Sequence, residues 1–133
     1  MTHQGGCHCG AVRYTVRGDP EFCSVCHCTD CRKSAGAPFV SWAAYQSQNF
    51  KIEGAVTEYH SSDNAYRHFC SKCGTGLYYV NESVLPGFVD IQSATLDDPE
   101  AIAPQIQVQV AEQLNWTHAM DQLPRFERYP PAE

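Results

Sequence analysis

The strongest constraint on the fold of this chain is a run of ten residues, 23–32, that carries four thiols and one imidazole. Thiolates are soft anionic ligands, and clusters of them in a reducing compartment indicate zinc or iron–sulfur sites more often than disulfides. Cys26 and Cys28 are two positions apart and share one face of an extended strand. The residues after Cys28 have the start signals of a short helix that ends at Gly36, and this helix turns Cys31 back toward the strand. The sequence therefore predicts that three sulfurs converge on one ion.

The role of the fourth thiol in this run, Cys23, is open at this stage. In one assignment the other three thiols bind the ion and leave a free position for water or substrate. In the second assignment Cys23 closes the site, which is then purely structural. If residues 22–28 form one strand, Cys23 points away from Cys26, and this favours the open site with Cys23 as a small buried residue. The same parity makes His27 a hydrogen-bonding neighbour rather than a ligand.

Two further cysteine pairs lie outside this run, and neither can complete a tetrahedral site alone. Cys7 and Cys9 are near the N-terminus, whereas Cys70 and Cys73 form a knuckle turn with a following glycine that lets backbone N–H groups point at sulfur. Together the two pairs make a four-cysteine site that ties the start of the chain to its middle. Closed four-sulfur sites are structural, and the free energy of zinc binding to them contributes largely to the free energy of folding. We therefore predict two zinc ions per chain.

Short alternating runs bounded by glycine and proline dominate the rest of the chain. In residues 11–17, Val12, Tyr14 and Val16 alternate with polar side chains, which is typical of a half-buried strand. Further strands are expected at residues 39–45, 50–53, 56–60, 66–70, 77–80, 88–92 and 106–110, with a hairpin turn at 61–64 and one helical turn at 96–101. A segment with Trp116 and residues 123–126 is expected to lie across the body. The sequence predicts one all-β or β-dominated domain over residues 1–133, with its core at about 5–126.

The composition limits the partners of the protein. The chain has 9 Lys and Arg against 15 Asp and Glu, and its formal net charge of −6 argues against a nucleic-acid partner. The N-terminal residues have no basic region and no apolar run, and no stretch has the length of a membrane span. We therefore expect a cytoplasmic protein without a membrane partner. Arg32 and Lys33 follow Cys31 directly, where a cation would stabilise a three-thiolate zinc and could hold a carboxylate; a solvated helix face is the alternative.

The three cysteine blocks occur in an order that resembles a known family. Residues 6–10 (GCHCG), 26–32 (CHCTDCR) and 69–74 (FCSKCG) resemble the glutathione-dependent formaldehyde-activating enzymes, a family that includes the centromere protein V type domains. The resemblance extends from about residue 5 to Phe126, because Trp116 and residues 121–124 are similar to the C-terminal signature of that family. It implies a zinc-stabilised β-tent fold of small coiled antiparallel sheets with one or two short helices. It also implies a structural zinc on Cys7, Cys9, Cys70 and Cys73, and a functional zinc on Cys26, Cys28 and Cys31.

The resemblance also implies an activity, the condensation of glutathione with formaldehyde to S-(hydroxymethyl)glutathione, which is a carbon–sulfur lyase reaction run in reverse. On this hypothesis Cys26, Cys28 and Cys31 hold the zinc that activates the thiol, and Arg32 is a candidate contact for an anionic group. Glutathione is the expected co-substrate, and formaldehyde or a related small electrophile is the expected partner. Two alternatives remain, a non-catalytic zinc-stabilised interaction module and a thiol- or metal-based redox sensor. The sequence makes no prediction of the oligomeric state.

Overall fold

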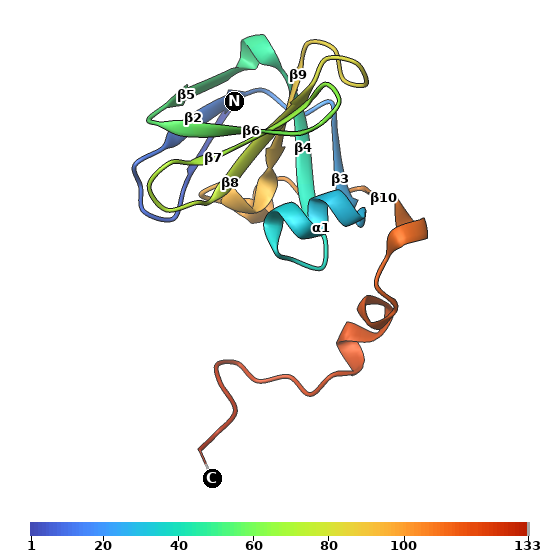
Figure 1. Ribbon diagram of the computed structural model, residues 1–133. Helices are drawn as coiled ribbons and strands as arrows, with labels where there is room; N and C mark the ends of the chain where they lie inside the picture. The colour runs from blue at the N-terminus through green and yellow to red at the C-terminus, as the bar shows by residue number, and fades with distance from the viewer. Residues whose placement is uncertain (133) are drawn as a thin grey trace.

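Ten strands and one α-helix make up the body of the computed structural model, which describes residues 1–132 (Figure 1). The strands are β1 (Thr2–Gly6), β2 (Arg13–Arg17), β3 (Phe22–Cys26), β4 (Val40–Gln46), β5 (Phe50–Glu53), β6 (Val56–Ser62), β7 (Ala65–Cys70), β8 (Gly76–Asn81), β9 (Phe88–Gln92) and β10 (Ile106–Val108). The α-helix is α1 (Thr29–Ala35), and short 3₁₀ helices lie at Ser47–Asn49, Ser93–Thr95, Pro99–Ala101, Val110–Glu112 and Asn115–Gln122. The β-dominated fold expected from the sequence is confirmed.

The strands form two sheets, one of three strands in the order β1-β2-β5 and one of seven in the order β10-β3-β4-β9-β8-β7-β6. Neighbouring strands pair antiparallel, as expected, except that β10 lies parallel to β3 at the edge of the larger sheet. This exception has a topological cause. The connection of residues 93–105 is long enough to carry the chain from β9 past β4 and β3, so that β10 runs in the same direction as β3.

The main core consists of side chains that alternate along the strands of both sheets. Tyr14 and Val16 of β2 are buried, as the alternation in the sequence predicted, and they belong to one apolar cluster with Tyr45, Leu77 and Ile91 of the larger sheet. Burial of such side chains stabilises the fold by about 1.5–3 kcal/mol each. This cluster therefore joins the two sheets.

A second, smaller cluster lies on the other face of the larger sheet. Along β4, Ala43 and Tyr45 belong to the main core, whereas the alternate residue Trp42 belongs to the second cluster. Cys26 and Cys31 are part of the same second cluster, with Tyr79 of β8 packed against it. The face of the sheet that carries these two cysteines is therefore distinct from the face that supports the main core.

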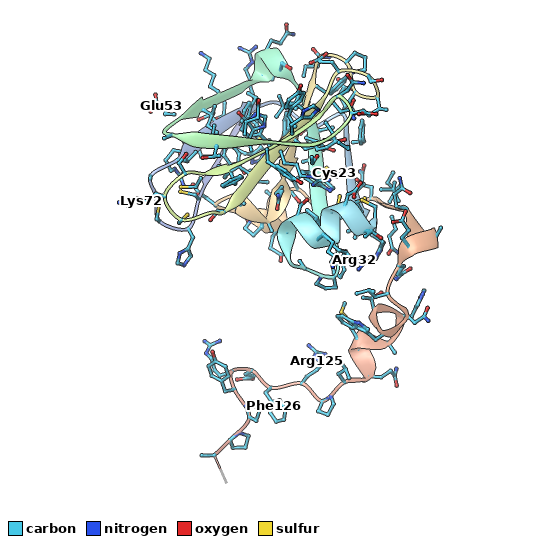
Figure 2. The ribbon with its side chains drawn as sticks, in the orientation of Figure 1. Cys23, Arg32, Glu53, Lys72, Arg125 and Phe126 are labelled. Atoms are coloured by element: carbon cyan, nitrogen blue, oxygen red, sulfur yellow. The ribbon has the colours of Figure 1, made fainter. Side chains whose placement is uncertain are left out.

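The C-terminal segment differs from the sequence-based expectation. Leu123 and Phe126 are 57% and 51% exposed, and Figures 1 and 2 show this segment leading away from the strands. The prediction that residues 123–126 lie across the body is wrong, because apolar side chains without a strand or helix period do not by themselves require a packing partner. Within residues 1–132, no helix is long and apolar enough to span a membrane.

Candidate metal centre

The junction between β3 and α1 brings three sulfurs together. Strand β3 ends at Cys26, and Cys28 is the N-cap of α1, where its Sγ accepts a hydrogen bond from the backbone N–H of Cys31 at 3.2 Å. The helix ends at Gly36, whose φ of 64° is accessible to glycine at little cost. The Sγ atoms of Cys26, Cys28 and Cys31 lie within 4.8 Å of one another. We call these residues the three-sulfur group.

Cys23 lies on the opposite face of the sheet from the three-sulfur group. It is 5% exposed and belongs to the main core, whereas Cys26 belongs to the second cluster. Burial raises the pKa of the Cys23 thiol, and the nearby Asp90 carboxyl raises it further. Cys23 and Cys26 thus point to opposite faces of the sheet, as expected for residues three positions apart in one strand. The structure does not bring Cys23 to the other three sulfurs.

The three-sulfur group lines a cavity of about 380 Å³. The cavity lies over the face of the larger sheet that carries the second cluster, so successive strands contribute its walls. These include Ser24 of β3, Trp42 of β4, Arg67 of β7, Tyr79 of β8, Asp90 of β9 and Val108 of β10. The sulfurs therefore border a space that holds aromatic, cationic and acidic groups.

The cation at this cavity is Arg67 rather than the expected Arg32. Nη2 of Arg67 lies 3.9 Å from Sγ of Cys31, and its guanidinium carbon lies 5.1 Å from the centre of the Tyr79 ring. Nη2 of Arg32 instead donates to the hydroxyl of Thr29 at 3.0 Å. Arg32 lines a separate hollow with Lys33 and Trp116, and it is not among the residues that line the cavity. Sequence reasoning missed Arg67, because its approach to Cys31 depends on how β7 and β8 pair.

Hydrogen bonds from the segment around β10 hold α1 and its cysteines in place. Oε1 of Glu112 accepts from the backbone N–H of Thr29 at 2.8 Å, and this bond lowers the pKa of the Glu112 carboxyl. His27 is buried, and its Nε2 lies 2.8 Å from Oε1 of Gln107 on β10. The structure thus bonds the side chain of His27 to β10, and His27 is not part of the three-sulfur group.

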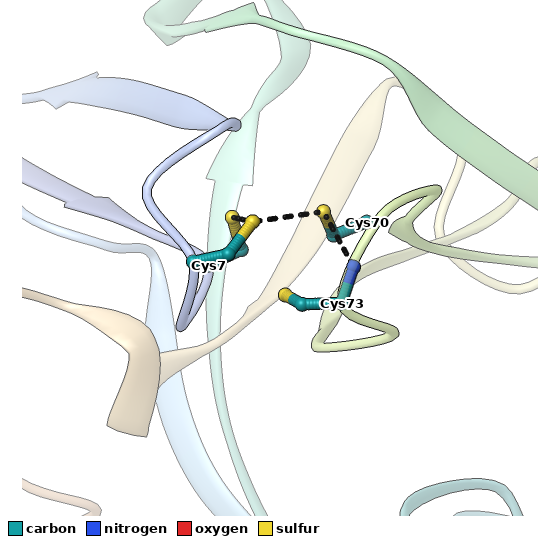
Figure 3. Close-up of side chains that lie close together, drawn as sticks. Cys7, Cys70 and Cys73 are labelled. Atoms are coloured by element: carbon teal, nitrogen blue, oxygen red, sulfur yellow. Dashed lines mark hydrogen bonds between the residues drawn. The ribbon is translucent and has the colours of Figure 1, made fainter.

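The other two cysteine pairs also meet in space. Sγ of Cys9 lies 3.6 Å from Sγ of Cys7 and 3.9 Å from Sγ of Cys70, although Cys9 and Cys70 are 61 positions apart in sequence. With Cys73, the four Sγ atoms lie within 4.8 Å of one another, and Figure 3 shows the side chains of Cys7, Cys70 and Cys73 close together. We call these residues the four-sulfur group. A Zn–S bond of about 2.3 Å requires tetrahedral sulfurs about 3.8 Å apart, so this group fits zinc.

Hydrogen-bond donors surround the sulfurs of the four-sulfur group. The backbone N–H of Val12 donates to Sγ of Cys7 at 3.2 Å, and that of Lys72 donates to Sγ of Cys70 at 3.3 Å. The Thr75 hydroxyl accepts from the N–H of His8, which leaves its own proton for Sγ of Cys73 at 3.2 Å. Hydrogen bonds from Thr75 lower the pKa of Cys73 to about 5. Donors of this kind favour thiolates, which are the form that binds metal.

Comparisons with known proteins identify a family that matches most of this chain. Residues 2–112 match the family model described as "Glutathione-dependent formaldehyde-activating enzyme". A Schizosaccharomyces pombe protein named an uncharacterized lyase is 34% identical over 78 residues, which are 59% of this chain and 57% of that protein. A Halomonas elongata protein, provisionally named a glutathione-dependent formaldehyde-activating enzyme, is 32% identical over 87 residues, which cover 59% of this chain and 55% of that protein. This chain thus matches little more than half the length of these curated relatives.

A solved structure supports the fold independently. The crystal structure of a Rhodobacter sphaeroides protein is similar to this one with a TM-score of 0.60 at 21% sequence identity. The similarity covers 79% of this chain and 99% of that protein, and it shows a shared fold. The family model covers far more than half of the chain and includes all seven cysteines of the two sulfur groups. The chain therefore belongs to the glutathione-dependent formaldehyde-activating enzyme family.

Proposed function

We propose that this protein catalyses the addition of a small thiol, glutathione or a close relative, to formaldehyde or a related small aldehyde, together with the reverse carbon–sulfur cleavage. The observation that carries this proposal is that three sulfurs converge at one wall of a cavity of about 380 Å³. Three soft donors beside an open space suit an ion that binds a ligand, whereas the four-sulfur group already has a full tetrahedral set. The family match and the names of the relatives agree with this chemistry.

In this proposal Cys26, Cys28 and Cys31 would hold a zinc ion at the wall of the cavity. Such an ion would supply a Lewis acid that lets a thiol in the cavity lose its proton near neutral pH. Three thiolates outweigh the charge of the ion, and the guanidinium of Arg67 beside Cys31 offsets the excess negative charge. Because Arg67 is held against Tyr79, its donors are already oriented when an anionic group enters.

The size and walls of the cavity favour small reactants. Its volume is near the lower end of the range of about 300–1,000 Å³ for ligand pockets, so it suits the thiol-bearing part of a short peptide and a one-carbon aldehyde. The rings of Trp42 and Tyr79 form part of the wall, with centroids 5.9 Å apart. The apolar surface of these rings lowers the local dielectric constant on their side of the cavity, which strengthens the interaction of a thiolate with Arg67.

The variant Cys31→Ser tests this proposal. Thiols add to formaldehyde without a catalyst, so the assay is magnetisation exchange by NMR between free and hydroxymethylated glutathione at equilibrium, compared with a protein-free sample. We expect Cys31→Ser to bring the exchange rate down to the protein-free value and to reduce zinc from two ions to one per chain.

The matched control is Cys23→Ala, which removes a buried thiol from the other face of the sheet. This variant should keep both zinc ions and the exchange rate of the natural protein. Full activity and full zinc content in Cys31→Ser would contradict the assignment of the site. A natural protein that does not exceed the protein-free rate would contradict the proposed function itself.

A further inference from the structure

A buried carboxyl without a partner lies in the wall of the cavity. Asp90 is in the middle of β9, where it pairs with Ala44 of β4 and Tyr79 of β8. Its side chain is on the cavity side of the sheet, because Val89 and Ile91 on either side of it belong to the main core. Asp90 is 9% exposed, and its buried Oδ1 has no hydrogen-bond partner within residues 1–132. Burial raises the pKa of Asp90 to about 7.

Unpartnered buried carboxyls destabilise a fold, so their presence requires a reason. The other acidic groups of the cavity differ from Asp90. Glu112 accepts the N–H of Thr29, and Asp30 is an exposed residue of the first turn of α1. The cation that lines the cavity, Arg67, has its Nη2 near Cys31 and forms no ion pair with Asp90 in the described part of the chain. Asp90 is therefore the acid whose bonding capacity is left for a molecule in the cavity.

We propose that Asp90 carries the proton between the sulfur and the oxygen of the reactants in the thiol–aldehyde reaction, an inference that rests on the function proposed above. Its carboxylate accepts the thiol proton as the thiol enters the site. The sulfur electron pair then forms the carbon–sulfur bond, the carbonyl π pair moves to oxygen, and that oxygen takes the proton from Asp90. Asp90 returns to the carboxylate, so the sum is one thiol and one aldehyde giving one hemithioacetal, without any other reactant.

The reverse reaction uses the same group in the same starting state. The Asp90 carboxylate takes the hydroxyl proton of the hemithioacetal, the carbonyl re-forms, and the carbon–sulfur bond breaks with its electron pair on sulfur. The proton then passes from Asp90 to the departing thiol. Because the free enzyme begins as the carboxylate in both directions, kcat/KM should rise with pH through the pKa of Asp90 in both directions.

Other ionisable groups share the cavity, so the pH profile must be assigned by substitution. They are Tyr79 from β8, Arg67 from β7, Glu112 from the segment after β10, Asp30 from α1 and the three-sulfur group from the β3–α1 junction. Cys23 is close to Asp90 but belongs to the main core. The rise of kcat/KM with pH that is due to Asp90 is the one that disappears in Asp90→Asn and persists in the control Asp98→Asn. Asp98 is exposed and its side chain makes no capping hydrogen bond.

The experiment measures the exchange rate of glutathione and formaldehyde, zinc content and thermal unfolding for the natural protein, Asp90→Asn and Asp98→Asn. We expect Asp90→Asn to keep both zinc ions. The part of the exchange rate that exceeds the protein-free value should fall about 100-fold, and the rise of this rate with pH near neutrality should disappear. We also expect it to unfold at a higher temperature than the natural protein, because it no longer buries an ionisable carboxyl. Loss of activity together with a gain of stability separates a chemical role from a structural one.

The pH dependence of stability gives a readout that needs no substrate. The folded state holds the Asp90 proton up to about pH 7, whereas an unfolded Asp loses it near pH 4, so the stability contributed by this proton is lost as pH rises from about 4 to about 7. The advantage of Asp90→Asn in unfolding temperature should therefore grow over this range and stay constant above about pH 7. Infrared difference spectra should show the carbonyl band of a protonated carboxyl disappearing around pH 7, in the natural protein and not in Asp90→Asn.

The outcomes distinguish the two proposals. Suppose that the natural protein accelerates the exchange. If Asp90→Asn accelerates it equally, or if Asp90→Asn keeps the rise of rate with pH near neutrality, the role of Asp90 is overturned and the proposed function stands. An Asp90 carboxyl that is fully ionised at pH 5 in the infrared spectra would also overturn it. If the natural protein does not accelerate the exchange at all, both proposals fail.

Discussion

The two sulfur groups offer the same ligand atom but differ in what surrounds it. The four-sulfur group joins two loops that are 61 positions apart, and backbone N–H groups and the Thr75 hydroxyl point at its sulfurs. The three-sulfur group comes from six consecutive residues, and its neighbours are a guanidinium, two aromatic rings and an unpartnered carboxyl around a cavity. Donors that hold thiolates suit a permanent crosslink, whereas open space with unused polar groups suits a changing ligand. The surroundings of the sulfurs, more than the sulfurs themselves, therefore distinguish a group suited to a structural crosslink from a group suited to binding a reactant.

The largest difference should appear when each group loses one sulfur. Cys70 is fully buried and links the β7–β8 turn to the N-terminal loop, so Cys70→Ser should remove zinc from the four-sulfur group. We expect a loss of about 5 kcal/mol or more in the free energy of unfolding, because binding of structural zinc is worth about 10 kcal/mol. Circular dichroism and zinc analysis should find the Cys70→Ser chain unfolded and Cys31→Ser folded. Equal losses of stability in both would break the comparison, because the three-sulfur group would then also be structural.

Removal of the cation beside the three-sulfur group should affect activity but not the fold. We expect Arg67→Gln to reduce kcat/KM by about 10- to 100-fold, because an oriented charge close to the thiolate is lost. Arg67→Lys should have an intermediate effect, since lysine keeps the charge without the planar fork that stacks on Tyr79. The comparison variant is Arg32→Gln, measured in the same exchange assay. A larger effect at Arg32 than at Arg67 would favour the contact expected from the sequence over the one seen in the structure.

The smallest change tests the donors of the four-sulfur group. Thr75→Val removes the hydroxyl that lies 3.2 Å from Sγ of Cys73 and should weaken zinc binding there by about tenfold. The rate of zinc transfer to a coloured chelator measures this change, and the exchange of glutathione and formaldehyde should stay the same. Thr57→Val is the control, because its hydroxyl bonds to Ser71 at an exposed position. If Thr75→Val lowered the activity instead, the two groups would not be independent.

Features that depend on nearby residues could be predicted from the sequence. The alternation of Tyr14 and Val16 predicted β2, and the spacing of Cys26, Cys28 and Cys31 predicted that these three sulfurs meet. A helix between Cys28 and Gly36 was expected, and the structure has α1 at Thr29–Ala35 with Cys28 itself as the N-cap. In each case a period of two or a capping pattern fixes the direction of a side chain without knowledge of the rest of the chain.

Features that depend on strand pairing could not be predicted. Strand β1 has the sequence THQGG, without apolar alternation, and it forms because it pairs with β2. Arg67 and Asp90 reach the cavity because β7, β8 and β9 are neighbours, and no local pattern specifies that order or register. The sequence did contain one signal for Asp90, a single acid inside the apolar strand FVDIQ. A charged residue in such a strand is a reason to look for a cavity.

The spacing of the ligands also has a consequence for the time at which each site can form. The three-sulfur ligands are complete once residue 31 has been synthesised, whereas Cys7 and Cys9 must wait for partners 61 or more positions downstream. At about 5–20 residues per second, this interval lasts about 3–12 seconds. During that time the first two thiols of the chain have no completed site to protect them. Their exposure to oxidants in a newly made chain is therefore set by the speed of the ribosome and not by the stability of the finished protein.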